Sequence, residues 1–334
     1  MERVGVIGAG AWGTALAEVV GSQGRPVLLW ARDPDLAAEI RRDRENARRL
    51  PGVRLSKSVQ PTSDVAEVAR FAEVLLLVTP AQTLRDLGRR LEPLVPDATP
   101  VVICAKGIER GTGKLTTEVV SEVLPGRPLA VLSGPTFAAE VAAGLPAAVT
   151  LACEDRDAGA AVVKALGSPT FRPYLSDDPV GAAIGGAIKN VIAIACGIVA
   201  GRQLGENARA ALVTRGLAEV ARLSAAKGAK PTTLMGLSGL GDLILTCTSE
   251  RSRNYAFGLR LGQGLGQEGG SGPEAGPRGI VEGAFTAQAA LELGDALSID
   301  LPIIAAVNAV LSDSSAIDAT IAGLLARPFR EETA

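Results

Sequence analysis

The stretch RVGVIGAGAWGTALAEVVG, residues 3–21, decides the fold of the first half of the chain. It begins with a short apolar segment typical of a buried strand, continues as G-x-G-x-x-G, and ends in a segment of helical character. The three glycines are Gly8, Gly10 and Gly13. Glycines at this spacing permit a tight turn and let a pyrophosphate approach the amino end of the following helix. We therefore predict a dinucleotide-binding turn.

Further apolar segments of strand length follow this turn. They alternate with helical or loop segments, which is the pattern of a parallel doubly wound sheet. The segments are PVLLWA, EVLLLVT, PVVICAK, PLAVLS and AAVTLAC. The ligand of such a sheet lies at the carboxyl ends of its strands.

The strand pattern stops near Ser176, and segments rich in alanine and leucine with helical character take over. The predicted fold is therefore an α/β N-terminal domain of the Rossmann type, residues 1–178, followed by an all-α C-terminal domain, residues 179–334. The stretch Gly262–Gly279 is rich in glycine and proline, and we predict a flexible surface loop there.

The composition favours a globular protein that binds small molecules. Its 34 basic and 36 acidic residues give a net charge of −2, and no block of one sign occurs. We therefore expect no nucleic-acid partner and no membrane insertion, and we leave open a homodimer. The first residues enter the apolar strand directly, without an export signal, so we expect a cytoplasmic protein.

Two residue types limit the chemistry. The sequence contains no histidine, which excludes Ser-His-Asp and Cys-His catalysis and histidine-ligated zinc. The four cysteines lie far apart and form no C-x-x-C pair. We expect buried thiols rather than disulfides, and we predict no metal site.

One lysine interrupts the apolar segment GGAIKNVIAIACGIVAG, residues 185–201. The segment is long enough to span a membrane, but a central lysine costs about 2.5–3.5 kcal/mol on insertion scales, which favours a buried helix of a soluble protein. At 3.6 residues per turn, Gly185, Gly186 and Ala193 share a face with Lys189. Small side chains let a backbone or a ligand come close, so we predict that Lys189 lies in the wall of a site.

Two cations follow predicted strands. Arg32 comes after the second strand, where a protein specific for NAD usually carries Asp or Glu. We interpret Arg32 as a contact to a 2′-phosphate, which favours NADP(H) over NAD(H). The alternative is a solvated arginine paired with Asp33. Lys106 ends the segment PVVICAK, and it lies either at the cofactor edge of the sheet or on the ordinary surface.

The turn in SGPTFAAEV offers backbone amides and the hydroxyl of Thr136 to an anion or a carbonyl oxygen. The alternative role of Thr136 is an ordinary helix cap. In GLSGLGDLILTCTSERSRN, Asp242 follows three glycines and precedes an apolar run, so it is either a functional carboxylate or a helix cap.

Three polar residues open a further helical stretch. Ser252, Arg253 and Asn254 combine a hydroxyl, a guanidinium and an amide at the predicted helix start. Such a set suits a phosphate. An exposed polar cap explains these residues equally well.

Six segments, taken in order, resemble the bacterial NAD(P)-dependent glycerol-3-phosphate dehydrogenases. They are GAGAWGTALA, CAKGIE, SGPTFAAEV, AIKNVIAIACGIVAG, GLGDLILTCTSERSRN and VEG. The resemblance covers almost the whole chain. It implies reversible reduction of dihydroxyacetone phosphate to sn-glycerol 3-phosphate with NADP(H) or NAD(H), for phospholipid synthesis. The Gly262–Gly279 stretch departs from the family, whose members are more helical there.

The resemblance also assigns site residues by their positions in the motifs. The cofactor contacts would be Gly8, Gly10, Ala11, Trp12, Gly13, Arg32, Lys106, Ala138, Arg253, Ile280 and Glu282. The substrate contacts would be Lys106, Gly134, Thr136, Lys189, Asp242, Ser252, Arg253 and Asn254. The catalytic group would consist of Lys189, Lys106 and Asp242, with Lys189 as the general acid and base.

The implied chemistry agrees with the residues present. Hydride transfer to a ketone leaves a developing alkoxide, which needs a positive charge and a proton, and a lysine can supply both. Burial lowers the pKa of a lysine from about 10.4 toward the working range. Asp242, if it lies close to Lys189, would oppose that shift and orient the ammonium group.

Two alternatives remain open on the sequence. A β-hydroxyacid dehydrogenase or ketopantoate reductase-like enzyme would share the Rossmann half and a helical lysine, although SERSRN favours a phosphorylated substrate. A cofactor-binding regulator without turnover would leave Lys106, Lys189 and Asp242 unexplained as a set. A cofactor oxidation assay distinguishes this regulator from an enzyme.

Overall fold

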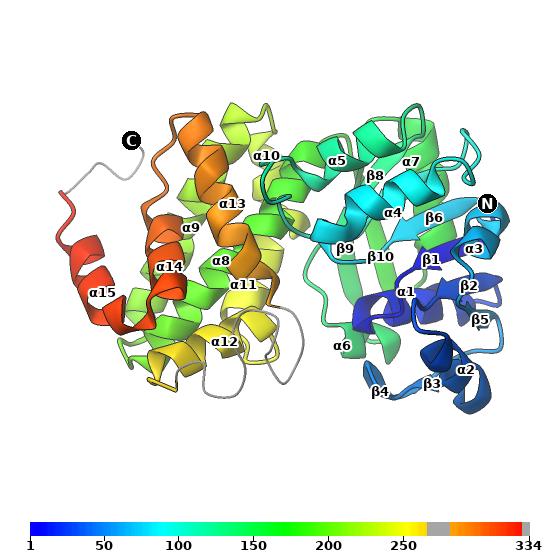
Figure 1. Cartoon of the computed structure of the whole chain (residues 1–334), viewed down its shortest axis with the longest axis horizontal. Coiled ribbons are helices and arrows are strands. Elements are labelled where there is room, and N and C mark those ends of the chain that lie inside the picture. Colours follow the sequence, from blue (N-terminus) through cyan, green and yellow to red (C-terminus); the bar gives the residue numbers. More distant parts are fainter. Residues whose placement is uncertain (266–280, 329–334) are drawn as a thin grey trace.

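The structure is a computed structural model that describes residues 1–265 and 281–328. A sheet flanked by helices lies on the right of Figure 1, and a helical part lies on the left. The strands are β1 Val4–Ile7, β2 Val27–Trp30, β3 Glu45–Asn46, β4 Leu50–Arg54, β5 Val59–Thr62, β6 Val74–Leu77, β7 Val101–Ile103, β8 Leu129–Ser133, β9 Ala147–Cys153 and β10 Phe171–Ser176.

Helices up to residue 166 belong to the sheet part, and those from residue 179 onward form the helical part. The first group is α1 Ala11–Gly21, α2 Pro34–Asp43, α3 Val65–Phe71, η1 Ala81–Thr83, α4 Leu84–Leu91, α5 Thr116–Val123, α6 Ala138–Ala142 and α7 Arg156–Leu166. The second group is α8 Pro179–Gly201, α9 Glu206–Ala226, α10 Pro231–Leu234, η2 Leu237–Gly241, α11 Asp242–Cys247, α12 Arg253–Gly262, α13 Glu282–Ala296, α14 Pro302–Ser312, η3 Ser314–Ala316 and α15 Ile317–Leu325.

The main sheet has eight strands in the order β10-β9-β8-β7-β6-β1-β2-β5. The strands from β8 to β5 pair in parallel, as the alternating pattern predicts. β9 pairs antiparallel with β8, and β10 pairs parallel with β9. The predicted parallel doubly wound sheet is therefore confirmed, except that β9 runs antiparallel to β8 at this edge. The helix after β8, α6, packs on α1 instead of returning along the sheet, so β9 starts where β8 ends and runs backward.

Successive residues of the central strands face two different cores, because side chains alternate across a strand. On β6, Val74 and Leu76 pack in one cluster with residues of α1, α2 and α7. Leu75 and Leu77 pack in the other cluster with residues of α3, α4 and α5. Helices thus cover both faces of the sheet, which is the doubly wound architecture expected from the sequence.

The glycine-rich turn joins β1 to α1 directly. Gly8 has a φ of +121°, a backbone conformation that residues with a side chain rarely adopt. A methyl group at Gly13 would collide with the carbonyl group of Gly8, whereas one at Gly10 would meet no atom within 4 Å. The turn is therefore tight on its inner side and open at Gly10.

Helix α8 is the centre of the helical part, and α9, α11, α12, α13 and α14 pack on it. Its length and hydropathy would suit a membrane span, but 94% of the apolar window is buried inside the protein. The prediction of a buried helix that carries Lys189 is confirmed, since Lys189 is only 8% exposed.

Glycines let α8 and α12 approach each other closely. Methyl groups at Gly197 or Gly201 of α8 would collide with backbone atoms of α12. Methyl groups at Gly258 or Gly262 of α12 would likewise collide with the backbone of α8. Each helix thus places two glycines, four residues apart, at their crossing.

The two parts share packing across their border. Ala182 and Ala183, in the first turns of α8, belong to the core on one face of the sheet. Ile108 and Leu115, on the segment that follows β7, belong to the core of the helical part. The segment that carries Lys106 is thereby held against α8. The four cysteines are free and buried, as predicted.

Candidate active site

One carboxylate joins two lysines between the parts. Lys189 Nζ on α8 donates a hydrogen bond to Asp242 Oδ1 at 2.5 Å, and Lys106 Nζ donates to Asp242 Oδ2 at 2.6 Å. Asp242 is 1% exposed. It is the first residue of α11, and the cap position before it belongs to Gly241, so the helix-cap interpretation of Asp242 is wrong. The side chain binds lysines instead. We call these three residues the lysine cluster.

The small residues of α8 allow this cluster to form. A methyl group at Gly185 would lie 2.7 Å from the carbonyl oxygen of Ser238, in the π-helical turn η2 that leads into Asp242. A methyl group at Gly186 would lie 2.8 Å from Ser133 Oγ and 3.5 Å from Lys106 Cγ. One face of α8 therefore accepts η2 and the Lys106 side chain at close range, one turn before Lys189.

Burial sets the proton affinity of the central lysine. Burial lowers the pKa of Lys189 from 10.5 to about 8, and the positive charge of Lys106 acts in the same direction. The negative charge of Asp242 opposes both effects. Lys189 is thus a buried group that can gain or lose a proton near neutral pH. The set carries one negative and two positive groups, which suits an anionic ligand.

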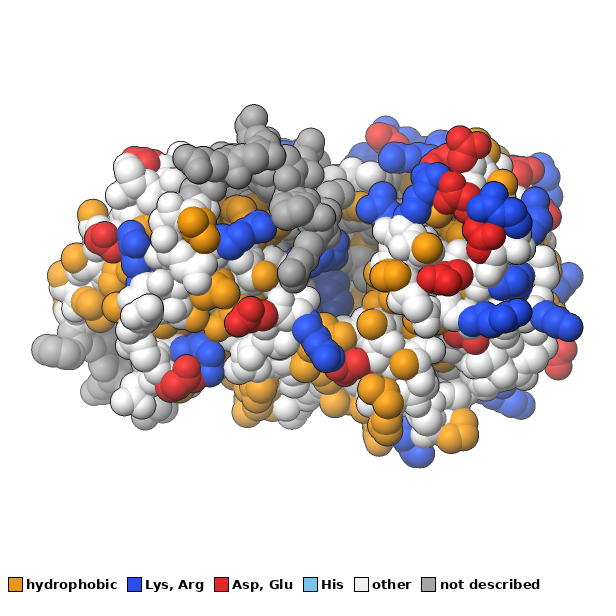
Figure 2. Space-filling model, turned by 90° about the horizontal axis from the view of Figure 1, so that it is seen from below, with side chains coloured by type: hydrophobic (Ala, Val, Ile, Leu, Met, Phe, Trp, Pro, Cys, Tyr) orange, Lys and Arg blue, Asp and Glu red, His pale blue; other side chains and the backbone are white. Residues whose placement is uncertain are grey.

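The order of the strands aligns several predicted site residues along one edge. Arg32 follows β2, the glycine-rich turn follows β1, Lys106 follows β7 and Gly134 follows β8, and these strands run parallel in the order β8-β7-β6-β1-β2. Their carboxyl ends therefore lie on the same side of the sheet. Figure 2 shows the surface hollowed between the two parts, with Lys or Arg side chains inside the hollow.

The glycine-rich turn leaves backbone amides available to a ligand. The first backbone bond within α1 runs from the Thr14 amide to the Gly10 carbonyl at 2.9 Å, so the amides of the first helical turn have no helical carbonyl to bind. The open space at Gly10 adjoins these amides. Trp12 lies in this turn, but its ring packs against Phe171 with centroids 6.4 Å apart. The Trp12 ring therefore contacts Phe171, while its backbone amide belongs to the first turn of α1.

Arg32 is exposed, and it forms no hydrogen bond or ion pair with any residue in the described ranges. Its expected alternative partner, Asp33, lies 3.1 Å from Arg48 and caps α2 through the amide of Asp35. The interpretation of Arg32 as an arginine paired with Asp33 is therefore wrong.

The SGPT turn lies between the lysine cluster and α1. Gly134 is buried against Val149 of β9, and Pro135 lies against Gly241, the residue before Asp242. Thr136 donates its hydroxyl hydrogen bond to the carbonyl of Gly134 at 3.3 Å. The cap position of α6 belongs to Phe137, so the interpretation of Thr136 as a helix cap is wrong. Ala138 is the first residue of α6, which packs on α1.

The start of α12 is a polar cap in part. Ser252 is 6% exposed and accepts the Tyr255 amide at 3.3 Å, so it caps the helix. Asn254 Nδ2 donates to Asn190 Oδ1 at 3.0 Å, and Asn254 Oδ1 accepts the Gly283 amide at 3.0 Å. Arg253 is exposed, and within the part of the chain that the structure describes it has no hydrogen-bond or ion-pair partner. Of these three residues, only Arg253 has a polar group without a partner in the described ranges.

Glu282 is the first residue of α13. Burial raises the pKa of its carboxyl group, while the positive charges of Arg253, Lys106 and Lys189 act to lower it. Glu282 thus lies in the field of the same cations that form the site. Ile280, the other predicted contact from this segment, lies outside the described residues, as does most of the Gly262–Gly279 stretch.

Comparison with known proteins identifies the family of this chain. Family models of the NAD-dependent glycerol-3-phosphate dehydrogenases match the chain, the N-terminal model over residues 3–159 and the C-terminal model over residues 178–322. The chain belongs to this family. The resemblance stated from the six sequence segments is confirmed.

Individual relatives of the family cover nearly the full length. A protein of Parvibaculum lavamentivorans named glycerol-3-phosphate dehydrogenase (NAD(P)+) is 51% identical over 99% of this chain and 98% of its own length. A protein of the same name from Rhodospirillum rubrum is 53% identical over 99% of this chain and 94% of its own. The crystal structure of glycerol-3-phosphate dehydrogenase from Coxiella burnetii has a TM-score of 0.91 at 36% identity, covering 98% of this chain and 99% of that one.

Two polar residues next to the lysine cluster of this family member escaped the sequence analysis. Thr246 Oγ1 lies 2.9 Å from Lys189 Nζ and donates to the Asp242 carbonyl at 2.6 Å. Asn190 follows Lys189 and is 4% exposed. One signal could have found Thr246, because it lies one helical turn after Asp242 and therefore shares its face. For Asn190 the sequence offers no signal except that it is a polar residue in an apolar helix.

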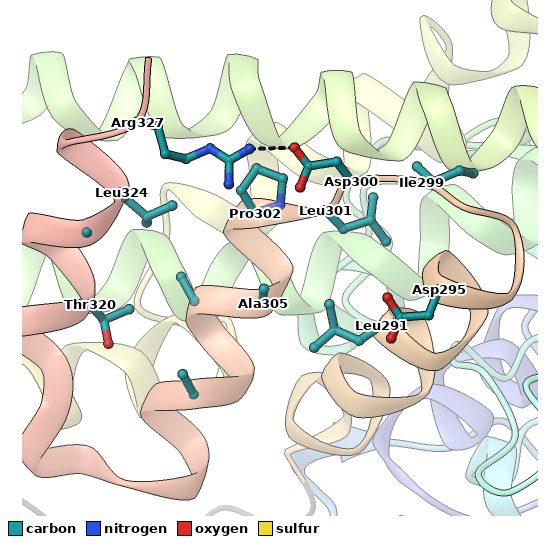
Figure 3. Close-up of a pocket in the computed structure, with 13 residues that line it drawn as sticks. Leu291, Asp295, Ile299, Asp300, Leu301, Pro302, Ala305, Thr320, Leu324 and Arg327 are labelled. Carbon is teal, nitrogen blue, oxygen red and sulfur yellow. Dashed lines mark hydrogen bonds and ion pairs between the residues drawn. The ribbon is translucent and has the colours of Figure 1, made fainter. Parts of the chain in front are cut away.

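A second hollow lies in the helical part, between α13, α14 and α15 (Figure 3). Its volume is about 410 Å³, and its lining mixes apolar side chains with the polar residues Asp295, Thr320 and Arg327. The charged residues Asp300 and Arg327 pair with each other across it at 2.5 Å. None of the predicted site residues lines this second hollow. A phosphorylated ligand would find its basic group already paired there, so the hollow beside the sheet is the better candidate.

Proposed function

We propose that this chain reduces dihydroxyacetone phosphate to sn-glycerol 3-phosphate, reversibly, with NADPH or NADH. The observation that carries the proposal is the lysine cluster at the cofactor edge of the sheet, with Lys189 and Lys106 on one buried carboxylate. Family membership and the names of the full-length relatives support the same substrate. The product would supply phospholipid synthesis in the cytoplasm.

The lysine cluster performs the proton chemistry in this proposal. When bound, the nicotinamide supplies the hydride to the ketone carbon. The ammonium group of Lys189 stabilises the negative charge that develops on the ketone oxygen and donates its proton to that oxygen. Asp242 fixes the direction of the ammonium group and raises its pKa against the effect of burial. In the reverse direction, neutral Lys189 removes the proton from the hydroxyl group.

The cofactor would extend along the carboxyl ends of the strands. The amides of Ala11, Trp12 and Gly13 at the start of α1 would bind the pyrophosphate, where the helix dipole favours an anion. Arg32 would meet the 2′-phosphate of NADP(H), since its guanidinium is exposed and unengaged within the described part. Ala138 and Glu282 would lie near the nicotinamide end, on the side of the lysine cluster.

The substrate phosphate would be bound at the start of α12. Arg253 supplies the charge, and Ser252 and Asn254 keep this helix start in place through their bonds to Tyr255 and Gly283. Lys106, Gly134 and Thr136 would border the substrate from the side of the sheet. We also propose a border between the domains at residues 178 and 179, where β10 has ended and α8 begins.

The test follows the absorbance of NADPH and of NADH with dihydroxyacetone phosphate present. We expect oxidation of the cofactor that requires this substrate. Oxidation with a 2-keto acid but not with dihydroxyacetone phosphate would favour the ketopantoate reductase-like alternative. Cofactor binding without oxidation on any of these substrates would favour the non-catalytic regulator.

A further inference from the structure

The acidic residue nearest to the carboxyl end of β2 is already engaged on both carboxylate oxygens. Asp33 Oδ1 accepts the backbone amide of Asp35 at 3.0 Å, which caps α2. Asp33 Oδ2 lies 3.1 Å from Arg48 Nη1. Arg48 lies in the segment between β3 and β4, and its second terminal nitrogen pairs with Glu39 of α2. An acidic residue at this end of a strand can bind ribose hydroxyls, but here both oxygens have partners.

The neighbouring residue Arg32, unlike Asp33, has a charge that no described residue compensates. Arg32 precedes Asp33 directly, is exposed, and has no partner among residues 1–265 and 281–328. If Arg48 were absent, the Asp33 carboxylate, next to Arg32 in the chain, would lose its ion-pair partner. It would compete with an incoming phosphate for Arg32 and would also repel that phosphate.

The charges therefore favour one of the two cofactors. With Arg48 in place, the negative charge of Asp33 is compensated, and Arg32 presents its charge to a dianionic group. Without Arg48, the same edge would carry an uncompensated carboxylate with an oxygen free to accept a hydroxyl group. The first state suits a 2′-phosphate, and the second suits the 2′-hydroxyl of NAD(H).

We propose that Arg48 is a positioning residue for cofactor selectivity and that it acts through Asp33. Its ion pair withholds the Asp33 carboxylate from the ribose and leaves Arg32 to the 2′-phosphate. This inference rests on the proposed function only in placing the adenosine ribose at the end of β2. No contact of Arg48 with the cofactor is required.

The experiment titrates NADPH and NADH separately into four proteins: the wild type, Arg48→Gln, Asp33→Asn and the double variant. Asn also caps helices well, so Asp33→Asn removes the charge but retains the start of α2. The readout is the ratio of the two dissociation constants. This ratio requires no turnover, so it can be measured even if the wild type does not reduce dihydroxyacetone phosphate. A wild type without that activity would count against the proposed function but not against this inference.

We expect Arg48→Gln to reduce the preference for NADPH by about two- to fivefold, the size typical of an exposed ion pair. Asp33→Asn should retain the preference, and in its background Arg48→Gln should change the ratio by less than about twofold, because the carboxylate that Arg48 compensates is gone. Arg48→Lys should restore most of the preference. The matched control Arg42→Gln, another exposed arginine of this region that pairs with Asp43, should leave the ratio unchanged.

Two outcomes would overturn the inference. If Arg48→Gln reduces the preference equally with and without the Asp33 charge, Arg48 acts on the phosphate directly. If Arg48→Gln leaves the ratio at the wild-type value, the ion pair has no part in selectivity.

Discussion

Asp242 accepts a hydrogen bond from Lys189 at 2.5 Å, although 53 residues separate them in the chain. The same carboxylate binds Lys106 through its other oxygen. Lys189 is held by the helical part and Lys106 follows a strand of the sheet, so the carboxylate ties the two halves together where the ligand would lie. Its charge also counteracts the effect of burial on the pKa of Lys189.

Asp242→Asn should therefore move the pH profile of ketone reduction to lower pH. Reduction requires protonated Lys189, whose pKa lies at about 8, so the wild-type kcat should fall as the pH rises through this value. Asn keeps the shape but removes the charge that raises the pKa, and the fall should begin earlier. The measurement is kcat from about pH 6 to 10 for both proteins.

Thr246→Val is the matched control for this experiment. It removes the other oxygen near Lys189 Nζ, at 2.9 Å, but changes no charge, so the profile should shift less. Melting curves establish that each variant is folded, because Asp242→Asn leaves two ammonium groups without their shared counter-ion. Superimposable profiles for the wild type and Asp242→Asn would exclude the electrostatic role.

Lys189→Met should abolish most of the turnover and leave the protein folded. Met keeps the length of the side chain and removes the ammonium group, and Asp242 retains its ion pair with Lys106. No buried charge loses all its partners, so the melting temperature and the NADPH affinity should stay near the wild-type values. We expect kcat for dihydroxyacetone phosphate to fall by roughly 10²–10⁴, the usual contribution of a positioned proton donor.

Lys230→Met serves as the control, because Lys230 is an exposed lysine paired with Asp177. Its kcat should match the wild type. A folded Lys189→Met protein that keeps kcat within a few fold would show that Lys189 is structural. The acid–base role would then pass to Lys106.

Local patterns predicted the elements that depend on neighbouring residues. The turn at Gly8 and Gly13, the apolar strands and the buried helix around Lys189 all follow from spacing and side-chain size. The direction of β9 does not follow from these local patterns, because it depends on where α6 packs. β10 also escaped, since Phe171–Ser176 shows an exposed pattern along an edge strand.

The site divides in the same way. Residue types and turn positions identified Lys106, Lys189 and Asp242 as candidates, but helix capping explained Asp242 equally well until its distance from the lysines was known. Asp33 appeared able to pair with Arg32, and only the fold brings Arg48 to it. Partners that lie far apart in sequence are fixed by tertiary packing, and no local pattern encodes them.

Arg253→Ala should weaken the binding of dihydroxyacetone phosphate with little effect on the unphosphorylated ketone. Arg253 is exposed at the start of α12 and unpaired within the described ranges, so its charge is available to the phosphate. Loss of a charge-assisted bond should raise the KM for dihydroxyacetone phosphate about tenfold or more. The feeble turnover of dihydroxyacetone should hardly change.

Arg251→Ala is the control for this pair of assays. Arg251 lies two residues away and pairs with Glu140, so its loss should affect the KM much less. If Arg253→Ala reduces the turnover of both ketones alike, Arg253 acts on the cofactor or on folding. The assignment of the phosphate to α12 would then be wrong.

Arg32→Asp should weaken NADPH more than NADH. Within residues 1–265 and 281–328 the guanidinium at the end of β2 has no partner, and reversing its charge removes a charge-assisted contact worth about 1.5–3 kcal/mol from the 2′-phosphate alone. Titration of both cofactors into the wild type and the variant measures the difference. Arg42→Asp provides the same charge change on α2 as a control. Equal losses for the two cofactors would remove Arg32 from the phosphate site.

Glu219 should make the stability of the helical part depend on pH. This α9 residue is 1% exposed, and its carboxylate accepts the amides of Ile303 and Ile304 at the start of α14, at 2.7 and 3.2 Å. Burial raises its pKa from 4.5 to about 7 against the effect of these bonds. Between these two values the folded state holds a proton that the unfolded state has lost, so this contribution is largest below pH 4.5 and is lost as the pH rises to about 7.

Glu219→Gln removes this titration. The free energy of unfolding of the wild type, relative to that of the variant, should fall by up to roughly 3 kcal/mol between about pH 5 and 7.5 and stay level above, because each unit of pKa shift corresponds to about 1.4 kcal/mol. Urea unfolding of both proteins across this range measures the difference, and other titrating groups cancel in the comparison. Glu292→Gln, an exposed glutamate on α13, should give a curve parallel to the wild type. A difference between the wild type and Glu219→Gln that does not change with pH would show that Glu219 keeps the same charge in the folded and unfolded states.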